Sequence, residues 1–270
     1  MPSHAQRNFL NRLRLFISLG KGIVILVFFA LSCGPSKSEK MHQEGLKLYD
    51  SHDYERAKVY FEAAAKEAPD NYIIWKDLGN VYLVGYEDHA TALQYYQKSL
   101  KIKPNYANAR HNIALIHEKE GRLELALKEF QDIIKEFPNF YFSYVEKANI
   151  LIKQKKISEA LKTVEKSLEI NANYPQSLYQ ASLIYYEYQK DYGNAEKFIL
   201  QTLKNSPQYA DALFLASRIY EKINHPGKSL FYMEKYYELV KDSPMEKSLL
   251  QNIKNEIGRL QKAKNLKARK

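Results

Sequence analysis

The sequence predicts an all-α protein, an α-solenoid of six helix-turn-helix hairpins followed by a C-terminal capping helix. The first observation is a set of small residues spaced by 34 or 35 positions: Ala57, Ala92, Ala126, Ala160, Ala195 and Ser229. A second set runs twelve or thirteen positions upstream of the first: Gly45, Gly79, Ala114, Ala148, Ser182 and Ser217. A period of this length indicates stacked helical hairpins, because one hairpin cannot bury its apolar face alone.

The composition is that of a folded helical protein. Hydrophobic residues make up 45% and charged residues 27% of the chain, which argues against intrinsic disorder. Tyrosine is frequent, with 22 residues, whereas the helix breakers Gly and Pro number only 10 and 9. This balance favours helices that pack through aromatic side chains.

The net charge of +10 is concentrated at the two ends of the chain. Residues 1–32 carry four basic residues and no acid, and residues 251–270 carry seven basic residues against one acid. The part between them, residues 33–250, is neutral. A nucleic-acid-binding surface needs basic charge gathered on the folded body, so we expect no nucleic acid among the partners.

The first 32 residues have the pattern of a signal peptide. Residues 1–21 are basic and acid-free, and residues 22–32 form a short, largely apolar run that ends in small residues. A membrane-spanning helix needs roughly 20 apolar residues, so the run is too short to be one. A secretory signal peptide has this order of segments.

The only cysteine of the chain, Cys33, follows this segment directly. Ala30, Leu31, Ser32 and Cys33 resemble the lipobox of bacterial lipoproteins, although leucine is usual where this chain has Ala30. The resemblance implies lipidation at Cys33, with residues 33–37 as a tether to the membrane. A lone cysteine cannot form an internal disulfide, which favours this interpretation. The alternative is an incidental cysteine in an uncleaved anchor.

The hairpins themselves resemble tetratricopeptide repeats. The second repeat carries the fullest match, in the W-x2-L-G-x2-Y spacing: Trp75, Leu78, Gly79, Tyr82, Ala92, Tyr96 and Pro104. The first and third repeats follow it: Gly45, Ala57, Phe61, Ala64 and Pro69, then Ile113, Ala114, Ala126, Phe130 and Pro138. The fourth to sixth repeats keep the small residues and a large residue four places after the second of them: Val164, Ile199 and Met233. Together the six repeats cover residues 38–243.

Packing explains the repeated residues. Small residues on both helices of a hairpin let the two backbones approach closely, and the large residue fills the space beside that contact. Proline ends most second helices, because the residue before it avoids the α region. Repeats two and five have one extra residue, which we expect between their helices, around residues 85–89 and 190–193.

A last helix is predicted over residues 245–260, where Leu249, Leu250, Ile253, Ile257 and Leu260 have helical spacing. Residues 244–270 are thus expected to form a capping helix and a basic tail, since the last hairpin needs its apolar side covered. The alternative is an amphipathic helix that binds a membrane surface.

The sequence offers no pattern for catalysis or for a cofactor. The seven histidines form no H-E-x-x-H or cysteine–histidine cluster, which leaves a metal site without support. Phosphate-binding loops, nucleophile elbows and dinucleotide-binding glycine patterns are also missing. We therefore expect neither an enzyme nor a bound metal or cofactor.

The resemblance implies a peptide groove, because the first helix of each hairpin lines the inner surface in this family. The implied lining residues are Lys76, Asn80, Asn108, Asn112, Asn149, Gln176, Tyr179, Phe214 and Arg218, with His42 and Val145 beside them. Lys76, Asn80 and Asn112 match three of five groups that clamp a terminal carboxylate in chaperone-binding members. Phe142 and Glu146 replace the two remaining basic groups, so a full clamp is not expected.

Amides interleaved with aromatic rings suit an extended or helical peptide. Replacement of Asn80, Asn112 and Asn149 with alanine is expected to weaken partner binding and to leave thermal stability nearly unchanged. The structural alternative is that these polar residues only solvate the helix faces.

The predicted function is a lipid-anchored scaffold or adaptor for protein–protein interactions in the bacterial cell envelope. The protein would be anchored in a membrane and face the periplasm, with a protein or peptide as its partner. Bacterial lipoproteins of this general shape include pilotins of pilus secretins. The alternative function is a peptide- or solute-binding component of an envelope transport system.

Overall fold

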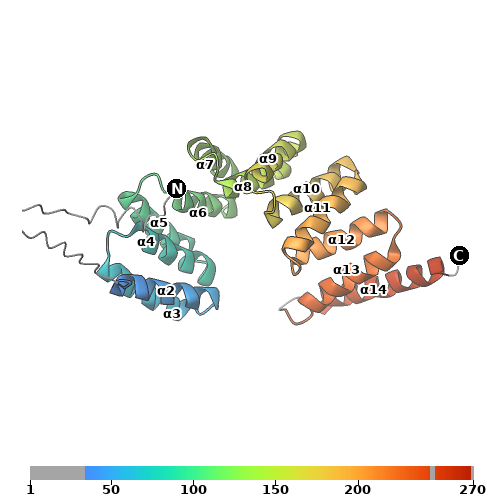
Figure 1. The fold of residues 1–270 in the computed structure, drawn as a ribbon, viewed down its shortest axis with the longest axis horizontal. Coiled ribbons are helices and arrows are strands. Elements are labelled where there is room, and N and C mark those ends of the chain that lie inside the picture. Colours follow the sequence, from blue (N-terminus) through green and yellow to red (C-terminus); the bar gives the residue numbers. More distant parts are fainter. Residues whose placement is uncertain (1–33, 244–246, 269–270) are drawn as a thin grey trace, which may run out of the picture. The chain divides into compact units, whose positions relative to one another are not determined.

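The computed structural model describes residues 34–243 and 247–268. The chain divides into two units, residues 1–36 and residues 37–270, and the second unit holds the helices described below. Six consecutive hairpins form that unit, each made of two antiparallel helices in sequence order (Figure 1). Thirteen α-helices and two π-helical turns account for the regular structure of the described residues, in which strands are absent. The predicted all-α solenoid is therefore confirmed.

The hairpins follow one another with short connections. The first three are α2 (Lys37–Asp50) with α3 (Tyr54–Glu67), α4 (Tyr72–Asn80) with α5 (His89–Ile102), and α6 (Ala107–Lys119) with α7 (Leu123–Glu136). The next three are α8 (Tyr141–Lys153) with α9 (Ile157–Ile170), α10 (Pro175–Ile184) with α11 (Tyr192–Asn205), and α12 (Ala210–Lys222) with α13 (Pro226–Val240). The π-helical turns η1 (Val81–Gly85) and η2 (Tyr185–Gln189) extend α4 and α10, and α14 (Lys247–Ala268) ends the array.

Local sequence explains where the second helices begin and end. Asp53, Asp88 and Asp191 cap α3, α5 and α11, and each side chain accepts a hydrogen bond from a backbone N–H three residues later. Such caps satisfy donors that a helix start leaves unpaired. At the other end, the residue after α3, α5, α7 and α11 directly precedes a proline and leaves the α region: Pro69, Pro104, Pro138 and Pro207.

The small residues lie where the two helices of each hairpin meet. A Cβ atom added to Gly45 would lie 2.6 Å from Cε1 of Phe61, and the ring of Tyr96 occupies the same space at Gly79. In the fifth hairpin Ser182 takes the place of glycine, and its Oγ donates a hydrogen bond of 2.8 Å to the carbonyl oxygen of Ala195. The predicted close approach of the helices is thus present in these hairpins.

The extra residue of repeats two and five lies partly inside a helix. The sequence places it near residues 85–89 and 190–193, between the helices, whereas the structure shows the π-helical turns η1 and η2 just before these loops. A π turn bonds residue i to residue i+5, so it contains one residue more than an α turn. The first helix therefore absorbs the insertion, and the packing residues of the second helix keep their places.

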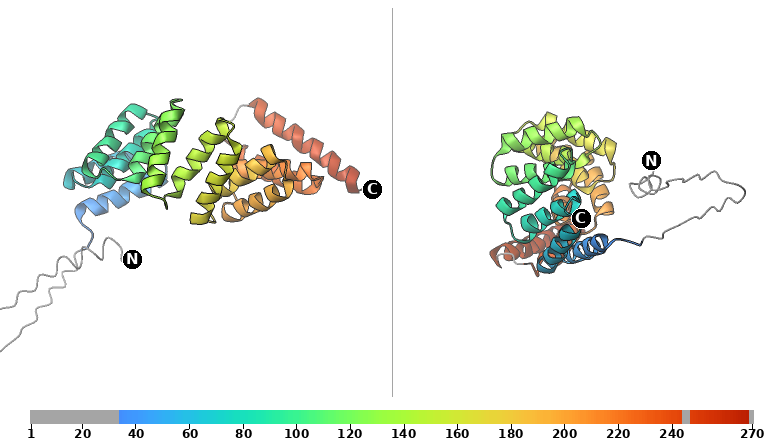
Figure 2. Two further views of the ribbon diagram at one scale, coloured as in Figure 1. Left: turned by 90° about the horizontal axis from the view of Figure 1, so that it is seen from above. Right: turned by 90° about the vertical axis from the view of Figure 1, so that its left-hand side faces the viewer.

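Helix α14 packs against the last hairpin (Figure 2). Its buried Ile253 and Leu260 join Leu230, Met233 and Val240 of α13 in one apolar cluster. This arrangement is that of a capping helix. The helix continues to Ala268, so the described basic residues of the expected tail lie on its last turns and not in a separate segment.

The expected signal peptide and Cys33 lie outside the described residues. Helix α2 begins at Lys37, so only Gly34, Pro35 and Ser36 of the expected tether precede it in the described part of the chain. Within the described residues, none of the helices combines the length and the apolar character required to cross a bilayer.

Candidate functional site

The residues implied as groove lining all lie on first helices of the hairpins, and we call this set the first-helix surface. Lys76 and Asn80 lie on α4, Asn108 and Asn112 on α6, Asn149 on α8, Gln176 and Tyr179 on α10, and Phe214 and Arg218 on α12. Asn108, Gln176 and Phe214 are exposed, and the other six are half-buried. The structure therefore separates residues that are available to a partner from residues that the fold itself uses.

Asp77 is the centre of the first polar network, and the sequence interpretation missed it. Only 4% of this residue is exposed. His42 Nε2 lies 2.8 Å from its Oδ2, Lys76 forms an ion pair with its Oδ1, and Asn80 Nδ2 donates to the same oxygen over 3.4 Å. A buried carboxylate needs such donors, because an unpaired buried charge costs several kcal/mol. The sequence did contain a sign of this contact, because Asp77 follows His42 by 35 residues and so occupies the equivalent position one repeat later.

Asn80 also joins the second repeat to the third. Its Oδ1 accepts hydrogen bonds from the hydroxyl of Tyr96, at 2.9 Å, and from Nδ2 of Asn112, at 2.7 Å. The three clamp-like residues Lys76, Asn80 and Asn112 are thus brought together. The carboxylate that Lys76 and Asn80 bind, however, belongs to Asp77 of the chain itself.

A second network joins the fourth and fifth repeats. Gln180 is buried, and its Nε2 donates to the carbonyl oxygen of Val145 at 2.9 Å and to Oδ1 of Asn149 at 2.5 Å. Asn149 Nδ2 in turn donates to Glu146 over 2.9 Å. Burial is the largest cause that raises the pKa of the Glu146 carboxyl above its ordinary range.

These contacts bear on the expected alanine replacements. Asn80 bonds Asn112 of the next repeat, and Asn149 bonds Gln180 of the next repeat. Loss of one partner leaves a polar group without its hydrogen bond, which costs roughly 1–3 kcal/mol when that group is buried. The prediction assumed that the three asparagines make no structural contacts, and these hydrogen bonds contradict that assumption. We now expect the triple replacement to lower the stability of the protein as well.

The last two hairpins and the capping helix enclose a pocket of about 390 Å³. Its lining residues come from α10 with η2, from α12, from Tyr236 of α13, and from Leu249 and Ile253 of α14. The implied groove residues Tyr179, Phe214 and Arg218 meet here. The sequence analysis did not predict that Glu187, Asp211 and residues of α14 line this pocket. The sequence pattern of a repeat does not show which residues a capping helix brings next to the last repeat.

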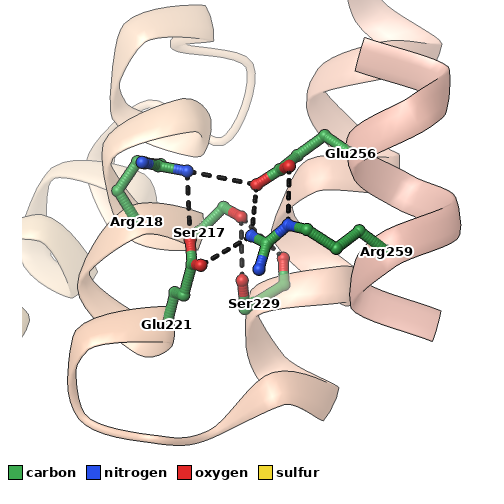
Figure 3. A network of polar contacts seen from close by, with 6 residues as sticks. All are labelled: Ser217, Arg218, Glu221, Ser229, Glu256 and Arg259. Carbon is green, nitrogen blue, oxygen red and sulfur yellow. Dashed lines mark hydrogen bonds and ion pairs between the residues drawn. The ribbon is translucent and has the colours of Figure 1, made fainter. Parts of the chain in front are cut away.

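Arg218 is held in a network of four charged groups (Figure 3). Its guanidinium lies 3.0 Å from Glu221 of the same helix and 3.1 Å from Glu256 of α14. Arg259 of α14 contacts the same two carboxylates, at 2.6 Å and 2.5 Å. Hydrogen bonds to Arg259 are the largest cause that lowers the pKa of Glu256. The network is neutral as a whole and links the capping helix to α12.

Metal ligands do not gather anywhere in the described part of the chain, where no group of three His, Cys, Asp or Glu side chains is close enough to hold an ion. His111 is buried instead, with its Nδ1 3.1 Å from the hydroxyl of Ser143. Its ring packs beside Phe130 and Phe140, with centroid distances of 5.3 Å and 5.5 Å. This histidine serves the packing between the third and fourth repeats.

Comparison with known sequences supports the repeat assignment. Models of the tetratricopeptide repeat match residues 42–107, 83–144 and 143–174. The human Protein O-mannosyl-transferase TMTC3 is 26% identical over 203 residues, or 70% of this chain. The mouse protein of the same name is 27% identical over 176 residues, or 60% of this chain. The aligned parts are 22% and 19% of the lengths of these two relatives.

Solved structures share the helical arrangement. PilF of Pseudomonas aeruginosa superposes with a TM-score of 0.64 and 20% identity, over 81% of this chain and 97% of PilF. PilW, described as a widely conserved type IV pilus biogenesis factor, superposes with a TM-score of 0.62 and 19% identity, over 80% of this chain and 97% of PilW. At this identity the similarity concerns the fold, since one fold serves many functions.

Proposed function

Because the chain is a tetratricopeptide repeat protein, we propose that it is a scaffold that binds a segment of a partner protein on its first-helix surface. Proteins built from this repeat bind protein or peptide partners. The binding segment would lie across several consecutive first helices, since these helices present equivalent positions in each repeat.

One observation carries the proposal. Three exposed side chains, Asn108, Gln176 and Phe214, each lie one helical turn before a residue that is already hydrogen-bonded within the chain: Asn112, Gln180 and Arg218. The networks hold the helices in register, and the exposed side chains remain for a partner. Rigid support of this kind lowers the entropy lost on binding.

The partner test compares two triple variants of the full chain. Asn108→Ala, Gln176→Ala and Phe214→Ala remove the exposed groups of the first-helix surface. The control changes three exposed residues of second helices with similar side chains: Gln97→Ala, Gln131→Ala and Phe231→Ala. Exposed residues away from packing contacts usually alter stability by no more than ~0.5 kcal/mol, so both variants should fold.

The measurement is capture of partner proteins from detergent-solubilised membranes, quantified by mass spectrometry against the unchanged protein. The first variant should lose partners that the control retains. Retention of the same partners by both variants would show that the first-helix surface is not the binding surface.

We further propose that the scaffold is a lipoprotein of the bacterial cell envelope, attached through Cys33 and facing the periplasm. The support is the basic, apolar and small-residue order of residues 1–32 and the lipobox-like sequence that ends in Cys33. The similarity in fold to PilW, described as a pilus biogenesis factor, is consistent with an envelope role. Two or more acyl chains would give firm attachment, since one chain alone binds a membrane only marginally.

Growth with a labelled fatty acid tests this attachment. The unchanged protein should incorporate the label, and Cys33→Ala should not. Equal labelling of the two proteins would rule out lipidation at Cys33, and membrane retention of an unlabelled alanine variant would indicate an uncleaved anchor.

A further inference from the structure

The pocket between α10, α12 and α14 has aromatic walls of the kind that bind cations. Tyr179, Tyr186, Phe214 and Tyr236 line it. Tyr179 also packs on Tyr209, with the ring centroids 5.2 Å apart. The faces of such rings attract ammonium and guanidinium groups through their electron distribution. At about 390 Å³, the pocket lies within the usual size range of ligand sites, ~300–1,000 Å³.

The charge in this pocket is negative once the internal pairs are subtracted. Arg218, the cation among the lining residues, is already bound by Glu221 and Glu256. The other two charged lining residues are Glu187 and Asp211. Within the described residues, Glu187 forms an ion pair only with the exposed Lys190, at 4.0 Å, and no ion pair involves Asp211.

Both carboxylates act on the same tyrosine. The pKa of the Tyr179 hydroxyl is raised to about 12, first by burial and then by Asp211 and Glu187. Both carboxylates thus lie close enough to Tyr179 to affect its ionisation, and all three residues line the pocket. A cation that enters the pocket would meet rings and carboxylates together.

A third carboxylate, that of Glu146 on α8, acts on Tyr209, whose ring packs on Tyr179 of the pocket. Burial is the main cause that raises the pKa of the Tyr209 hydroxyl to about 12, and Tyr179, Asp211 and Glu146 raise it further. Tyr209 therefore feels the carboxylates of both Asp211 and Glu146. The carboxylate of Glu146 is half-buried and forms no ion pair among the described residues, and its one hydrogen bond comes from Asn149.

The network around Glu146 leaves one acceptor unpaired. The Oε1 atom of Gln180 is buried without a hydrogen-bond partner, although Gln180 Nε2 makes two hydrogen bonds.

From these observations we infer that the first-helix surface of α8, α10 and α12 selects a partner segment that carries lysine or arginine side chains. The inference rests on the proposed scaffold function and adds the chemistry of the bound segment. Charge complementarity identifies the occupant, because Glu187 and Asp211 line a pocket with aromatic residues and Glu146 stands on the preceding first helix. Among the described residues, the one ion pair of these three carboxylates is the 4.0 Å contact of Glu187 with the exposed Lys190. In chaperone-binding members, by contrast, basic groups stand at the positions of Phe142 and Glu146 and bind a carboxylate.

The test uses a fluorescent peptide in which arginines alternate with glycine and serine, and a second peptide in which citrulline replaces every arginine. Citrulline keeps the shape of arginine and removes its charge. Binding to the full-length protein in detergent micelles is measured by fluorescence anisotropy at physiological salt. The arginine peptide should bind about tenfold more tightly than the citrulline peptide.

Two triple variants with the same change of net charge locate the effect. Glu146→Gln, Glu187→Gln and Asp211→Asn should abolish the preference for arginine. The control, Asp132→Asn, Glu159→Gln and Glu165→Gln, changes three exposed acids of second helices and should keep it. Circular dichroism checks that both variants remain helical.

Three outcomes would overturn the inference. Equal affinity of the unchanged protein for the two peptides would overturn the inference, and so would a control variant that loses the preference. Full displacement of the peptide by free arginine at equal concentration would overturn it too, because the pocket would then be a solute site. The scaffold proposal is judged separately, since the capture experiment with the Phe214 triple variant does not depend on peptide charge.

Discussion

Lowering the pH should destabilise the protein through His111 of α6. This residue is 9% exposed, is packed beside Phe130 and Phe140, and forms a hydrogen bond with Ser143. Burial lowers the pKa of its imidazole from an ordinary value of 6.5 to about 4. Burial causes the shift, and within the described residues His111 has no carboxylate partner to stabilise a positive charge on the ring.

The direction and size of the effect follow from proton linkage. The unfolded chain protonates His111 as the pH falls through about 6.5, whereas the folded chain resists protonation until about pH 4. Stability is therefore full above pH 6.5 and decreases between pH 6.5 and pH 4. One pKa unit corresponds to about 1.4 kcal/mol, so the loss is about 2 kcal/mol at pH 5 and about 3 kcal/mol below pH 4.

Urea unfolding at neutral and at mildly acidic pH, followed by circular dichroism, measures this loss. His111→Gln keeps a hydrogen-bonding group for Ser143 and removes the titration, so its free energy of unfolding should change less with pH by about 2 kcal/mol. Titration of the His111 ring by NMR gives the folded-state pKa directly. A folded-state pKa near 6.5, or the same pH dependence in the variant, would refute the reasoning.

Four further substitutions test the packing of the hairpins and the attachment of α14. Gly79→Ala places a Cβ atom in the ring of Tyr96 and should lower the free energy of unfolding in urea by ~1–3 kcal/mol. The control is Gly258→Ala on α14, whose added Cβ atom meets nothing within 4 Å, and it should be neutral or raise the free energy of unfolding by up to ~1 kcal/mol. Ala126→Leu overpacks a fully buried position and should lower the thermal midpoint, with the largest increase in hydrogen exchange in α6 and α7; an unchanged midpoint would contradict the repeat register. Glu256→Gln weakens the contacts of two arginines and should cost ~0.5–1 kcal/mol, seen as faster exchange of α14 alone. Uniform exchange along the chain in this last variant would mean that the network does not attach the capping helix.

The sequence could predict the hairpins because stacking restricts single residues. The rings of Phe61 and Tyr96 leave no space for a side chain at Gly45 and Gly79. Because each such contact requires one small and one large residue, their spacing in the sequence predicts the hairpins. Helix α14 was predictable for a similar reason, since its leucines and isoleucines share one helical face. Its length was not, because the last turns are exposed and carry no apolar pattern.

The candidate site was predictable only as a set of positions. Register assigned Lys76, Asn80 and Asn112 to neighbouring first helices, but it could not show that Asp77 of the same chain binds two of them. Which side chains pair across repeats depends on rotamers and on helix rotation, neither of which a repeat pattern contains. The same holds for Asn149, whose partner Gln180 lies on the next first helix.

The two π turns allow a repeat to gain a residue without a shift in the packing residues that follow. In a coiled coil, one inserted residue shifts the phase of every later contact. Here η1 and η2 each take up one residue within their own hairpin, and Ala92 and Ala195 remain fully buried after them. Length changes of a single residue are thus local events in this architecture, and repeats of unequal length can present an aligned series of first helices to the same ligand.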